Sequence, residues 1–483
     1  MKRNRQKRGG ADATNRSIMR AAYAVTALFL AMIVYIGWFV QAEAPKVIGN
    51  TYNPRVDLLA QRVVRGKIKT SDGVVLAQTE TAEDGTEQRS YAQGALYAPV
   101  TGYIQKGKTG VEALANFYLL SSHVNLIERT EKELLGQKNT GDNVWLTVDH
   151  SLTETASSAL GDRAGAVIAM DPGTGKILTM VSKPSFDPNT IAEDWDRLTA
   201  ADNDRGQLLN RAAQGAYPPG STFKILTLLA YVHAHPADYE NFTFDCTGVY
   251  TDSEGNEIRC YGGEVHGKQT LSEAFANSCN GAFAKIGSEL PEGDLSGIAS
   301  SLLFNTALPY ALPYTQSRFR LSGDDSLFVQ EQTAIGQGET TMSPLHNLLI
   351  TSAIANGGVL MKPMILDHLE NAGAEDFKIF QPETYGKLLS GEDASYLSEM
   401  MRRVVTDGTG SAFRDAPYEA HAKTGSAEYE SGKGKKTHAW CVAFAEADGR
   451  RIAVCALVED GETGGKTAAP IARAVMDAWL SGS

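Results

Sequence analysis

The sequence predicts an α+β protein built around one antiparallel five-stranded sheet that is flanked by helices. Five strand-like segments lie in two groups that are far apart in the chain, and mostly helical segments separate the groups. Helices inserted between the strands of one antiparallel sheet are typical of an α+β domain of roughly 300 residues. The expected strands are residues 164–171, 176–181, 421–429, 439–445 and 451–458.

The N-terminal segment predicts a membrane anchor. Residues 1–20 contain seven lysines and arginines and one acid, whereas residues 21–40 carry no charge. An apolar run of that length can cross a bilayer as a helix, and flanking positive charge marks the cytoplasmic side. We therefore expect a basic cytoplasmic tail over residues 1–20 and a transmembrane helix over 21–42, with the remaining chain outside the membrane.

A cleaved signal peptide is the alternative for this segment, because Ala42-Glu43-Ala44 has the form of a cleavage site. The apolar run is longer than the usual ~7–15-residue signal core, which favours an uncleaved anchor.

Two domains are expected after the anchor. Residues 43–160 are polar and mixed, with short strand-like segments and a helical segment over residues 110–121. We interpret them as a small pedestal or dimerisation-like domain that lifts the rest of the chain off the membrane. Residues 161–483 hold the five-stranded sheet and its helices. The net charge of −12 argues against nucleic acid as a partner.

Residues 217–224 are the first candidate for a catalytic site. A turn rich in proline leads to Ser221, and Lys224 follows one helical turn later on the same face. A serine hydroxyl needs a nearby base before it becomes a good nucleophile, and a buried neutral lysine amine can be that base. A serine near a helix start is more often an N-cap, but this is the only Ser-x-x-Lys in the chain.

Two further motifs follow in the chain, Ser278-Cys279-Asn280 and Lys423-Thr424-Gly425. The Ser278 hydroxyl can relay protons, and the Lys423 ammonium group supplies positive charge. Taken singly, the first motif is more often a polar turn between helices than a catalytic motif, and a second Lys-Thr-Gly at residues 108–110 is interpreted as a plain turn. The three motifs in this order are much more specific, since such a set marks penicillin-binding proteins and class A β-lactamases.

On these residues the chain resembles a class B penicillin-binding protein, a membrane-anchored peptidoglycan D,D-transpeptidase. The resemblance covers nearly the whole chain, and several further segments share it. These are residues 209–212 before the candidate nucleophile, His266-Gly267, Gly336-Gln337-Gly338 ahead of Ser343-Pro344, and Arg65-Gly66-Lys67-Ile68 in the pedestal.

The resemblance implies a role for each residue of the proton-transfer machinery. Ser221 would be the acylated nucleophile and Lys224 its base. Ser278 would bridge Lys224 and Lys423 and pass a proton to the leaving D-alanine.

The resemblance also implies how the substrate is held. Asn280 would bind the amide of the donor peptide, Gly425 would let the substrate backbone lie close, and Thr424 and Ser426 would hold the terminal carboxylate. The backbone N–H groups of Ser221 and Ser426 would form the oxyanion hole. Peptidoglycan stem peptides and β-lactam antibiotics are the implied ligands, a polytopic membrane glycan polymerase is the implied partner, and no cofactor or metal is implied.

Four other functions stay open at this point. A serine β-lactamase shares the three motifs, and a D,D-carboxypeptidase differs only in its water acceptor. A β-lactam sensor and an inactive scaffold are disfavoured, because no His-Glu-x-x-His motif accompanies the chain and every motif residue is present. Glu289 and Glu292 are candidates for a deacylating base, but Pro291 between them predicts a polar turn and solvated acids.

The five cysteines are an odd number, so at least one thiol stays unpaired within the chain. Cys246 and Cys260 flank a short polar segment, and we expect a disulfide between them. We expect Cys279 to be a free thiol in the wall of the site. The spacing of cysteines and histidines does not resemble a zinc site.

Overall fold

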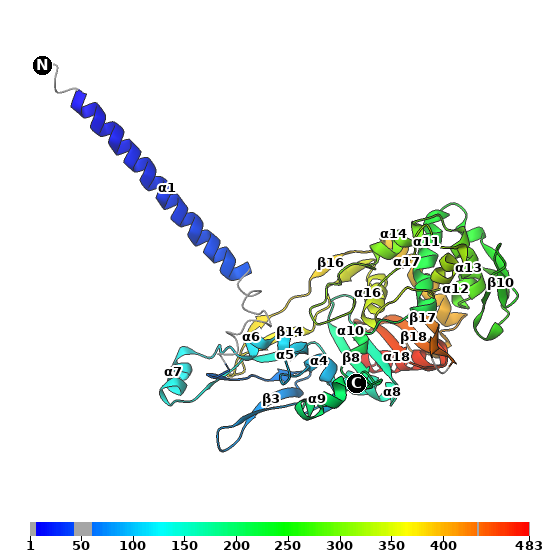
Figure 1. Ribbon diagram of the computed structural model, residues 1–483, viewed down its shortest axis with the longest axis horizontal. Helices are drawn as coiled ribbons and strands as arrows, with labels where there is room; N and C mark the ends of the chain where they lie inside the picture. Colours follow the sequence, from blue (N-terminus) through cyan, green and yellow to red (C-terminus); the bar gives the residue numbers. More distant parts are fainter. Residues whose placement is uncertain (1–5, 43–59, 432–433, 483) are drawn as a thin grey trace.

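The central sheet of the larger domain has five antiparallel strands in the order β17-β18-β19-β7-β8, as the sequence predicted (Figure 1). The computed structural model describes residues 6–42, 60–431 and 434–482. The hairpin β7–β8 and the three-stranded meander β17–β18–β19 come from opposite ends of the domain sequence. Strand β19 joins them by pairing with β7, where Val458 lies opposite Gly165. The strands are β7 (Gly165–Met170), β8 (Ile177–Lys183), β17 (Ala420–Ser431), β18 (Gly434–Ala447) and β19 (Arg450–Val458).

Alternating side chains of this sheet belong to two different hydrophobic cores. Ile168 packs in the core that contains α16 (Pro344–Ala355), whereas Val167 packs in the core that contains α18 (Ala469–Leu480) and α8 (His150–Leu160). Successive strand residues point to opposite faces, so a nearly continuous apolar run fits a sheet that helices cover on both sides. The amphipathic pattern of residues 469–480, with Pro470 near the start, predicts a helix over that range, and the bounds of α18 confirm it.

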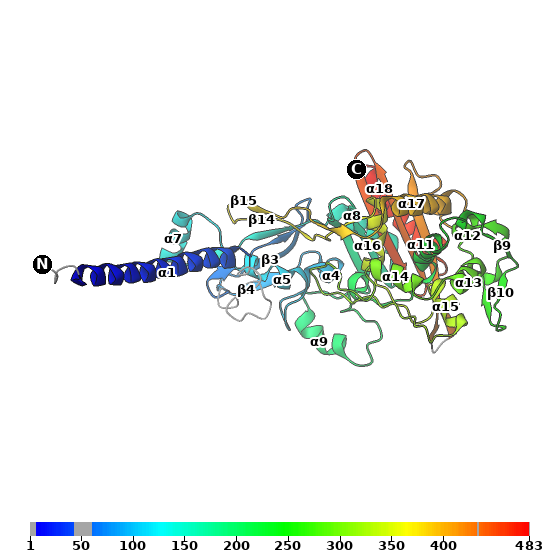
Figure 2. The same ribbon diagram turned by 90° about the horizontal axis from the view of Figure 1, so that it is seen from above.

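The helical region between the two strand groups carries the first two catalytic motifs. Its helices are α9 (Ile191–Thr199), α10 (Arg211–Gln214), α11 (Lys224–Ala234), α12 (Leu271–Ala276), α13 (Asn280–Glu289), α14 (Asp294–Ser301), α15 (Leu327–Ala334) and α17 (Gly391–Thr406). Figures 1 and 2 show α11, α12 and α13 at the end of the molecule that lies away from α1, whereas α9 lies beside the pedestal. Short hairpin strands beside them are β9 (Thr243–Cys246), β10 (Val249–Thr251), β11 (Glu257–Arg259), β12 (Gly267–Thr270), β13 (Val359–Met361) and β16 (Thr384–Lys387).

The pedestal contains a six-stranded sheet in the order β15-β14-β6-β2-β3-β4. Its two outermost strands on one side, β14 (Leu366–Glu370) and β15 (Asp376–Ile379), come from residues that the sequence analysis assigned to the larger domain. The pedestal is therefore built from two separate stretches of chain. Its other elements are β1 (Val63–Val64), β2 (Ile68–Lys69), β3 (Val75–Thr81), β4 (Glu87–Ser90), β5 (Asn139–Thr140), β6 (Asn143–Leu146), α4 (Ala98–Thr101), α5 (Gly110–Leu114), α6 (Asn116–Leu119) and α7 (Leu126–Leu134).

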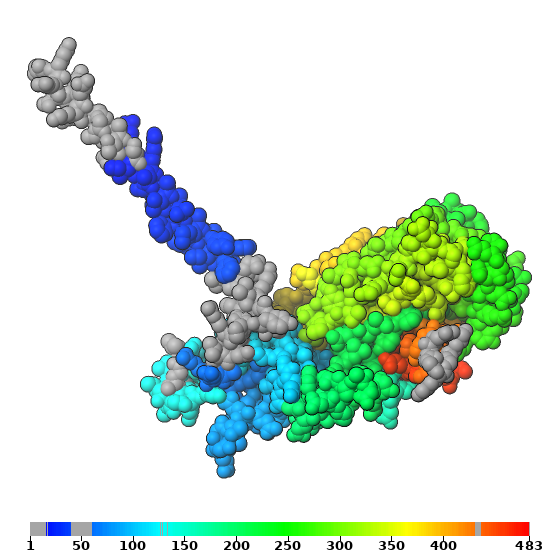
Figure 3. Space-filling model, in the orientation of Figure 1, coloured from blue at the N-terminus to red at the C-terminus, as the bar shows by residue number. Residues whose placement is uncertain are grey.

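A single long helix, α1 (Gln6–Ala42), precedes the pedestal. Within it, the segment Ile18–Phe39 is long and apolar enough to cross a membrane. Figure 3 shows α1 standing clear of the folded domains. The described part of the predicted cytoplasmic tail is helical, while residues 43–59 of the predicted pedestal lie outside the described residues.

Candidate active site

Ser221 and Lys224 lie where a tight turn becomes a buried helix. Ser221 belongs to a short 3₁₀ turn, η2 (Gly220–Phe223), and Lys224 is the first residue of α11. The apolar run after the turn predicts a helix over residues 221–234, whereas in the structure a turn of 3₁₀ helix comes first and the α-helix begins at Lys224. Gly220 has φ +53°. That angle lies in the left-handed region, where glycine is favoured, so the residue suits the abrupt change of direction before the nucleophile.

The side chain of Lys224 is fully buried and is held by neutral oxygens. Its Nζ donates hydrogen bonds of 2.6 Å to the backbone carbonyl of Ser278 and 2.7 Å to Oδ1 of Asn280. Burial penalises the charged ammonium form and lowers the pKa of Lys224 to about 8. With that pKa, about a tenth of the Lys224 amine is neutral at pH 7, compared with less than about a thousandth at the ordinary lysine pKa of about 10.4, and the neutral amine is the form that a general base requires.

Ser278 connects the second motif to the third. It lies between α12 and α13 with φ +57°, a left-handed conformation that costs energy for a residue other than glycine. Lys423 Nζ donates a 2.8 Å hydrogen bond to the Ser278 hydroxyl oxygen. Ser278 therefore contacts both lysines, through its backbone carbonyl for Lys224 and through its hydroxyl for Lys423.

The third motif lies on β17 at the edge of the sheet. Lys423 is fully buried, and burial, followed by the nearby charge of Lys224, holds its pKa well below the usual value. Thr424 Oγ1 lies 2.6 Å from Thr409 Oγ1, and Ser426 Oγ accepts a 3.2 Å hydrogen bond from the backbone N–H of Gly464. Thr424 and Ser426 are two residues apart, so their side chains lie on one face of the strand.

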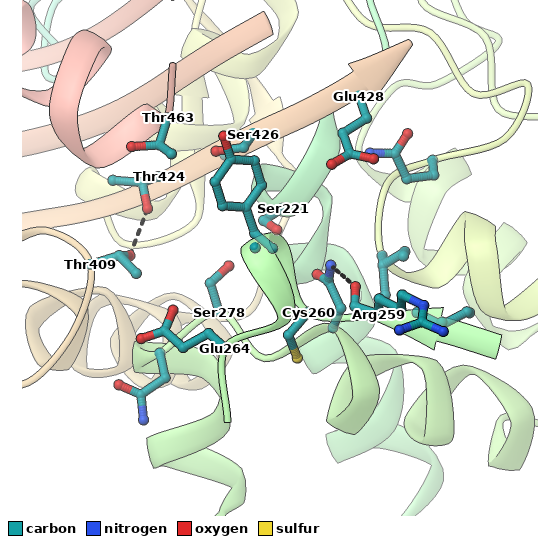
Figure 4. Close-up of a pocket in the computed structure, with 18 of the residues that line it drawn as sticks. Ser221, Arg259, Cys260, Glu264, Ser278, Thr409, Thr424, Ser426, Glu428 and Thr463 are labelled. Atoms are coloured by element: carbon teal, nitrogen blue, oxygen red, sulfur yellow. Dashed lines mark hydrogen bonds between the residues drawn. The ribbon is translucent and has the colours of Figure 1, made fainter. Parts of the chain in front are cut away.

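Most of the predicted site residues line one groove, and the two lysines lie beneath it. The groove has a volume of about 1110 Å³. Figure 4 shows Ser221, Ser278, Thr424 and Ser426 gathered around it from three different parts of the chain. The predicted residues that line it are Ser221, Ser278, Asn280, Thr424, Gly425 and Ser426.

Close backbone packing fixes the nucleophile turn against β17. A Cβ atom on Gly425 would lie 3.1 Å from the backbone nitrogen of Thr222, and one on Gly336 would lie 1.9 Å from the carbonyl oxygen of Gly220. The Gly220 N–H donates a 2.8 Å hydrogen bond to the Gly336 carbonyl. Two glycines that the motifs contain thus leave room for the turn that carries Ser221.

Sequence reasoning missed two contributors to this site. Thr409 pairs with Thr424, and the backbone carbonyl of Arg259 accepts a 3.0 Å hydrogen bond from Nδ2 of Asn280. The only local signal for Thr409 is that it lies in a Gly-Thr-Gly loop. This loop packs closely, since a Cβ atom on Gly408 would lie 2.0 Å from the carbonyl oxygen of Ala276. No sequence feature predicts the contact of Arg259 with Asn280.

Four secondary expectations have clear outcomes. Glu289 and Glu292 are exposed, as predicted, and neither is among the residues that line the groove. Residues 108–110 form the predicted loop before a helix, α5 of the pedestal. The expected Cys246–Cys260 disulfide is wrong: both are free thiols with 3.6 Å between their sulfur atoms. Cys279 is a buried free thiol, as expected.

The geometry defines a serine-type acyl-transfer site, because a serine lies beside a buried lysine and a second lysine contacts a hydroxyl at the same groove. Comparisons with known proteins support this class of site. The penicillin binding protein transpeptidase domain matches residues 165–477, and the penicillin binding protein A dimerisation domain matches residues 65–144. The chain therefore belongs to the class B penicillin-binding proteins.

Individual relatives match almost end to end. The peptidoglycan D,D-transpeptidase PbpA of Mycolicibacterium smegmatis is 32% identical over 495 residues, which cover 96% of this chain and 99% of the relative. The structure of penicillin-binding protein A from Mycobacterium tuberculosis, a ceftriaxone acyl-enzyme complex, superposes with a TM-score of 0.78 at 30% identity and covers 88% of this chain and 100% of that one. The D,D-transpeptidase domain of a peptidoglycan glycosyltransferase from Eggerthella lenta gives a TM-score of 0.75 at 30% identity, over 86% of this chain and 99% of its own.

Proposed function

We propose that this protein is a peptidoglycan D,D-transpeptidase that cross-links stem peptides through an acyl-enzyme on Ser221 and releases D-alanine. One observation carries the proposal: Lys224 is buried one turn from Ser221 and bonded to neutral oxygens of the second motif. An amine in that position can accept the serine proton at neutral pH. The relatives named D,D-transpeptidases and the β-lactam acyl-enzyme structures support the same chemistry.

In the acylation step, Ser221 Oγ attacks the carbonyl carbon of the penultimate D-alanine, and its proton moves to Lys224. The backbone N–H groups of Ser221 and Ser426 stabilise the oxyanion, and each such donor is worth about 10²–10³ in rate in other enzymes. The bond from that carbon to the nitrogen of the terminal D-alanine then breaks. Ser278 passes its hydroxyl proton to that nitrogen and takes up the proton that Lys224 accepted from Ser221, while Lys423 holds the Ser278 hydroxyl.

The substrate groups assigned to the groove follow from its lining. The hydroxyls of Thr424 and Ser426 bind the terminal carboxylate of the donor, and Asn280 binds the peptide amide. Gly425 keeps the strand edge free of a side chain. In the second half of the reaction, the amine of a neighbouring stem peptide attacks the ester carbon, and Ser221 recovers its proton. β-Lactams acylate the same serine.

A serine β-lactamase would need a carboxylate base aimed at the ester. The two acids that follow the second motif, Glu289 and Glu292, are exposed and lie outside the groove lining, whereas Glu257, Glu264 and Glu428 line it. The lifetime of the acyl-enzyme therefore decides between the transpeptidase and this alternative. A D,D-carboxypeptidase uses the same site with water as acceptor, so the acceptor test below separates it from a transpeptidase.

The setting of the enzyme is part of the proposal. Helix α1 anchors the chain in the cell membrane as a single span, with the pedestal, which includes β14 and β15, and the transpeptidase domain on the outer side. Its basic N-terminal tail favours this orientation. A polytopic membrane glycan polymerase supplies the glycan strands that this enzyme cross-links.

Labelling with a fluorescent penicillin tests the nucleophile. Wild-type protein and the control Ser301→Ala, an exposed serine on α14, should be labelled, whereas Ser221→Ala should not. Label on the Ser221 variant would contradict the assignment.

A second experiment tests the reaction. The intact mass of penicillin-acylated protein is followed after excess drug is removed, and a thioester donor is then offered with a D-amino acid acceptor. A transpeptidase keeps the adduct for many minutes and forms the amide product. Loss of the adduct within seconds would indicate a β-lactamase, and hydrolysis of the donor without amide formation would indicate a carboxypeptidase.

A further inference from the structure

Four buried side chains converge behind the second catalytic motif. Cys246 ends β9, Cys260 follows β11, His266 precedes β12, and Cys279 caps α13. Their three sulfur atoms and one ring nitrogen all lie within 4.8 Å of one another. The cysteines are at most 4% exposed and the histidine side chain is 8% exposed.

The separations between these atoms match the edges of a zinc tetrahedron. Zn–S bonds of ~2.3 Å and a Zn–N bond of ~2.0 Å give S–S edges of about 3.8 Å and S–N edges of about 3.5 Å. Cys246 Sγ lies 3.6 Å from Cys260 Sγ, and Cys260 Sγ lies 3.8 Å from Cys279 Sγ. Cys246 Sγ lies 3.3 Å from His266 Nδ1.

The surroundings of the cluster suit a bound cation with thiolate ligands. His266 turns Nδ1 toward the sulfurs, while its Nε2 lies 3.7 Å from a carboxylate oxygen of Glu264. A carboxylate at the far nitrogen is the usual arrangement for a metal-bound histidine. Cys279 Sγ accepts a 3.5 Å hydrogen bond from the backbone N–H of Ala282 at the start of α13, and this contact holds the sulfur atom facing the other three side chains.

We propose that Cys246, Cys260, His266 and Cys279 bind one zinc ion. Three thiolates and one imidazole are soft ligands that select zinc over magnesium or calcium. All four positions of the tetrahedron are filled by protein side chains, which is typical of a structural rather than a catalytic zinc site. The ion therefore takes no part in the bond-breaking steps.

The ion holds the second catalytic motif in place, an inference that rests on the proposed function. Cys279 lies between Ser278 and Asn280, and Ser278 has a strained left-handed conformation. Cys260 adjoins Arg259, whose carbonyl accepts the hydrogen bond from Asn280. Figure 4 shows Cys260 between Ser278 and Arg259, below Ser221. A zinc ion on these cysteines ties the hairpins of residues 243–270 to the segment that contacts both catalytic lysines.

Metal analysis of the full-length protein, purified in detergent with a thiol reductant and without chelator, tests the site directly. One zinc ion per chain is expected in the wild type and in the control Cys455→Ala, which removes a buried thiol of β19 that does not belong to the cluster. The double variant Cys246→Ser/Cys260→Ser should contain less than about a tenth of that amount, because two of four ligands are lost. Wild-type protein without zinc, or with a Cys246–Cys260 disulfide in its intact mass, would overturn the proposal.

Cobalt replacement covers the case in which the double variant fails to fold. Wild-type protein is stripped of metal with a chelator and refilled with Co²⁺. Thiolate-to-cobalt charge-transfer absorption and the visible bands of tetrahedral cobalt are expected, and zinc should displace them. Their absence would contradict the site. The acylation rate of the stripped protein should fall at least about tenfold and recover when zinc is added. If acylation is unchanged and the cobalt spectrum is present, the metal site is supported and only its effect on Ser278 is refuted.

Discussion

Lys423 Nζ donates a 2.8 Å hydrogen bond to the hydroxyl oxygen of Ser278, a residue 145 positions earlier in the chain. The contact joins the strand edge to the turn between α12 and α13. The Ser278 hydroxyl lines the groove, and this contact joins it directly to the buried amino group of Lys423. This pair is the structural basis of the proton relay in the proposed reaction.

Removal of the Ser278 hydroxyl should lower acylation by about 10²–10⁴, the usual contribution of a proton-transfer group. The measurement is the second-order rate of labelling by a fluorescent penicillin. Ser278→Ala keeps the strained backbone, whereas Ser278→Gly relaxes it, because glycine tolerates φ +57°. Both variants should be equally slow if the hydroxyl matters. Full activity in the alanine variant would exclude the relay.

Gly336→Ala should displace the nucleophile turn. The new Cβ atom would lie 1.9 Å from the Gly220 carbonyl oxygen, so the turn that carries Ser221 must shift. A shift of about 1 Å in a catalytic group can cost 10²-fold in rate. The control is Gly85→Ala, which has a similar φ of +82° but no atom within 4 Å of the added Cβ. Acylation kinetics should separate the two variants, and equal rates would refute the steric argument.

Glu112→Gln should destabilise the pedestal. The fully buried Glu112 carboxylate pairs with Arg65 at 2.6 Å and with Arg89 at 2.7 Å. Removing its charge leaves two buried guanidinium groups uncompensated, at a cost of about 3–5 kcal/mol in the free energy of unfolding. Urea unfolding measures this loss.

The matched control for this prediction is Glu462→Gln, since Glu462 forms an exposed ion pair with Lys466. Its effect on unfolding should stay below about 1 kcal/mol. Similar losses in the two variants would show that the pedestal charges are not effectively buried.

Glu331 on α15 should make stability depend on pH. Its carboxylate is fully buried and has no hydrogen-bond partner among the described residues. Burial, followed by the negative charge of Asp252, raises the pKa of Glu331 to about 7. The folded state therefore holds a proton that the unfolded state has already released, and this stabilisation is lost as the pH rises through about 7.

Glu331→Gln should remove that loss. Melting temperatures measured from about pH 5 to about pH 8 should fall less in the variant than in the wild type, because the amide cannot ionise. The exposed Glu339, changed to Gln, is the control and should follow the wild type. Parallel curves for Glu331→Gln and the wild type would contradict the raised pKa.

The sequence by itself determined the elements whose signals are local. Apolar runs and turns predicted all five strands of the central sheet, and the amphipathic pattern gave the bounds of α18. The ordered motifs around Ser221, Ser278 and Lys423 predicted the family, because each motif occupies only a few adjacent residues. Residue types and spacing within one turn are sufficient for such inferences.

Only the tertiary structure decided which distant residues meet. The strands β14 and β15 join the pedestal sheet although they follow α16 in the chain, and Thr409 reaches Thr424 from a separate loop. The cluster of Cys246, Cys260, His266 and Cys279 has no recognisable spacing, since its members come from the ends of separate hairpins and a helix. Long-range packing brings these ends together, and no local pattern of residues records it.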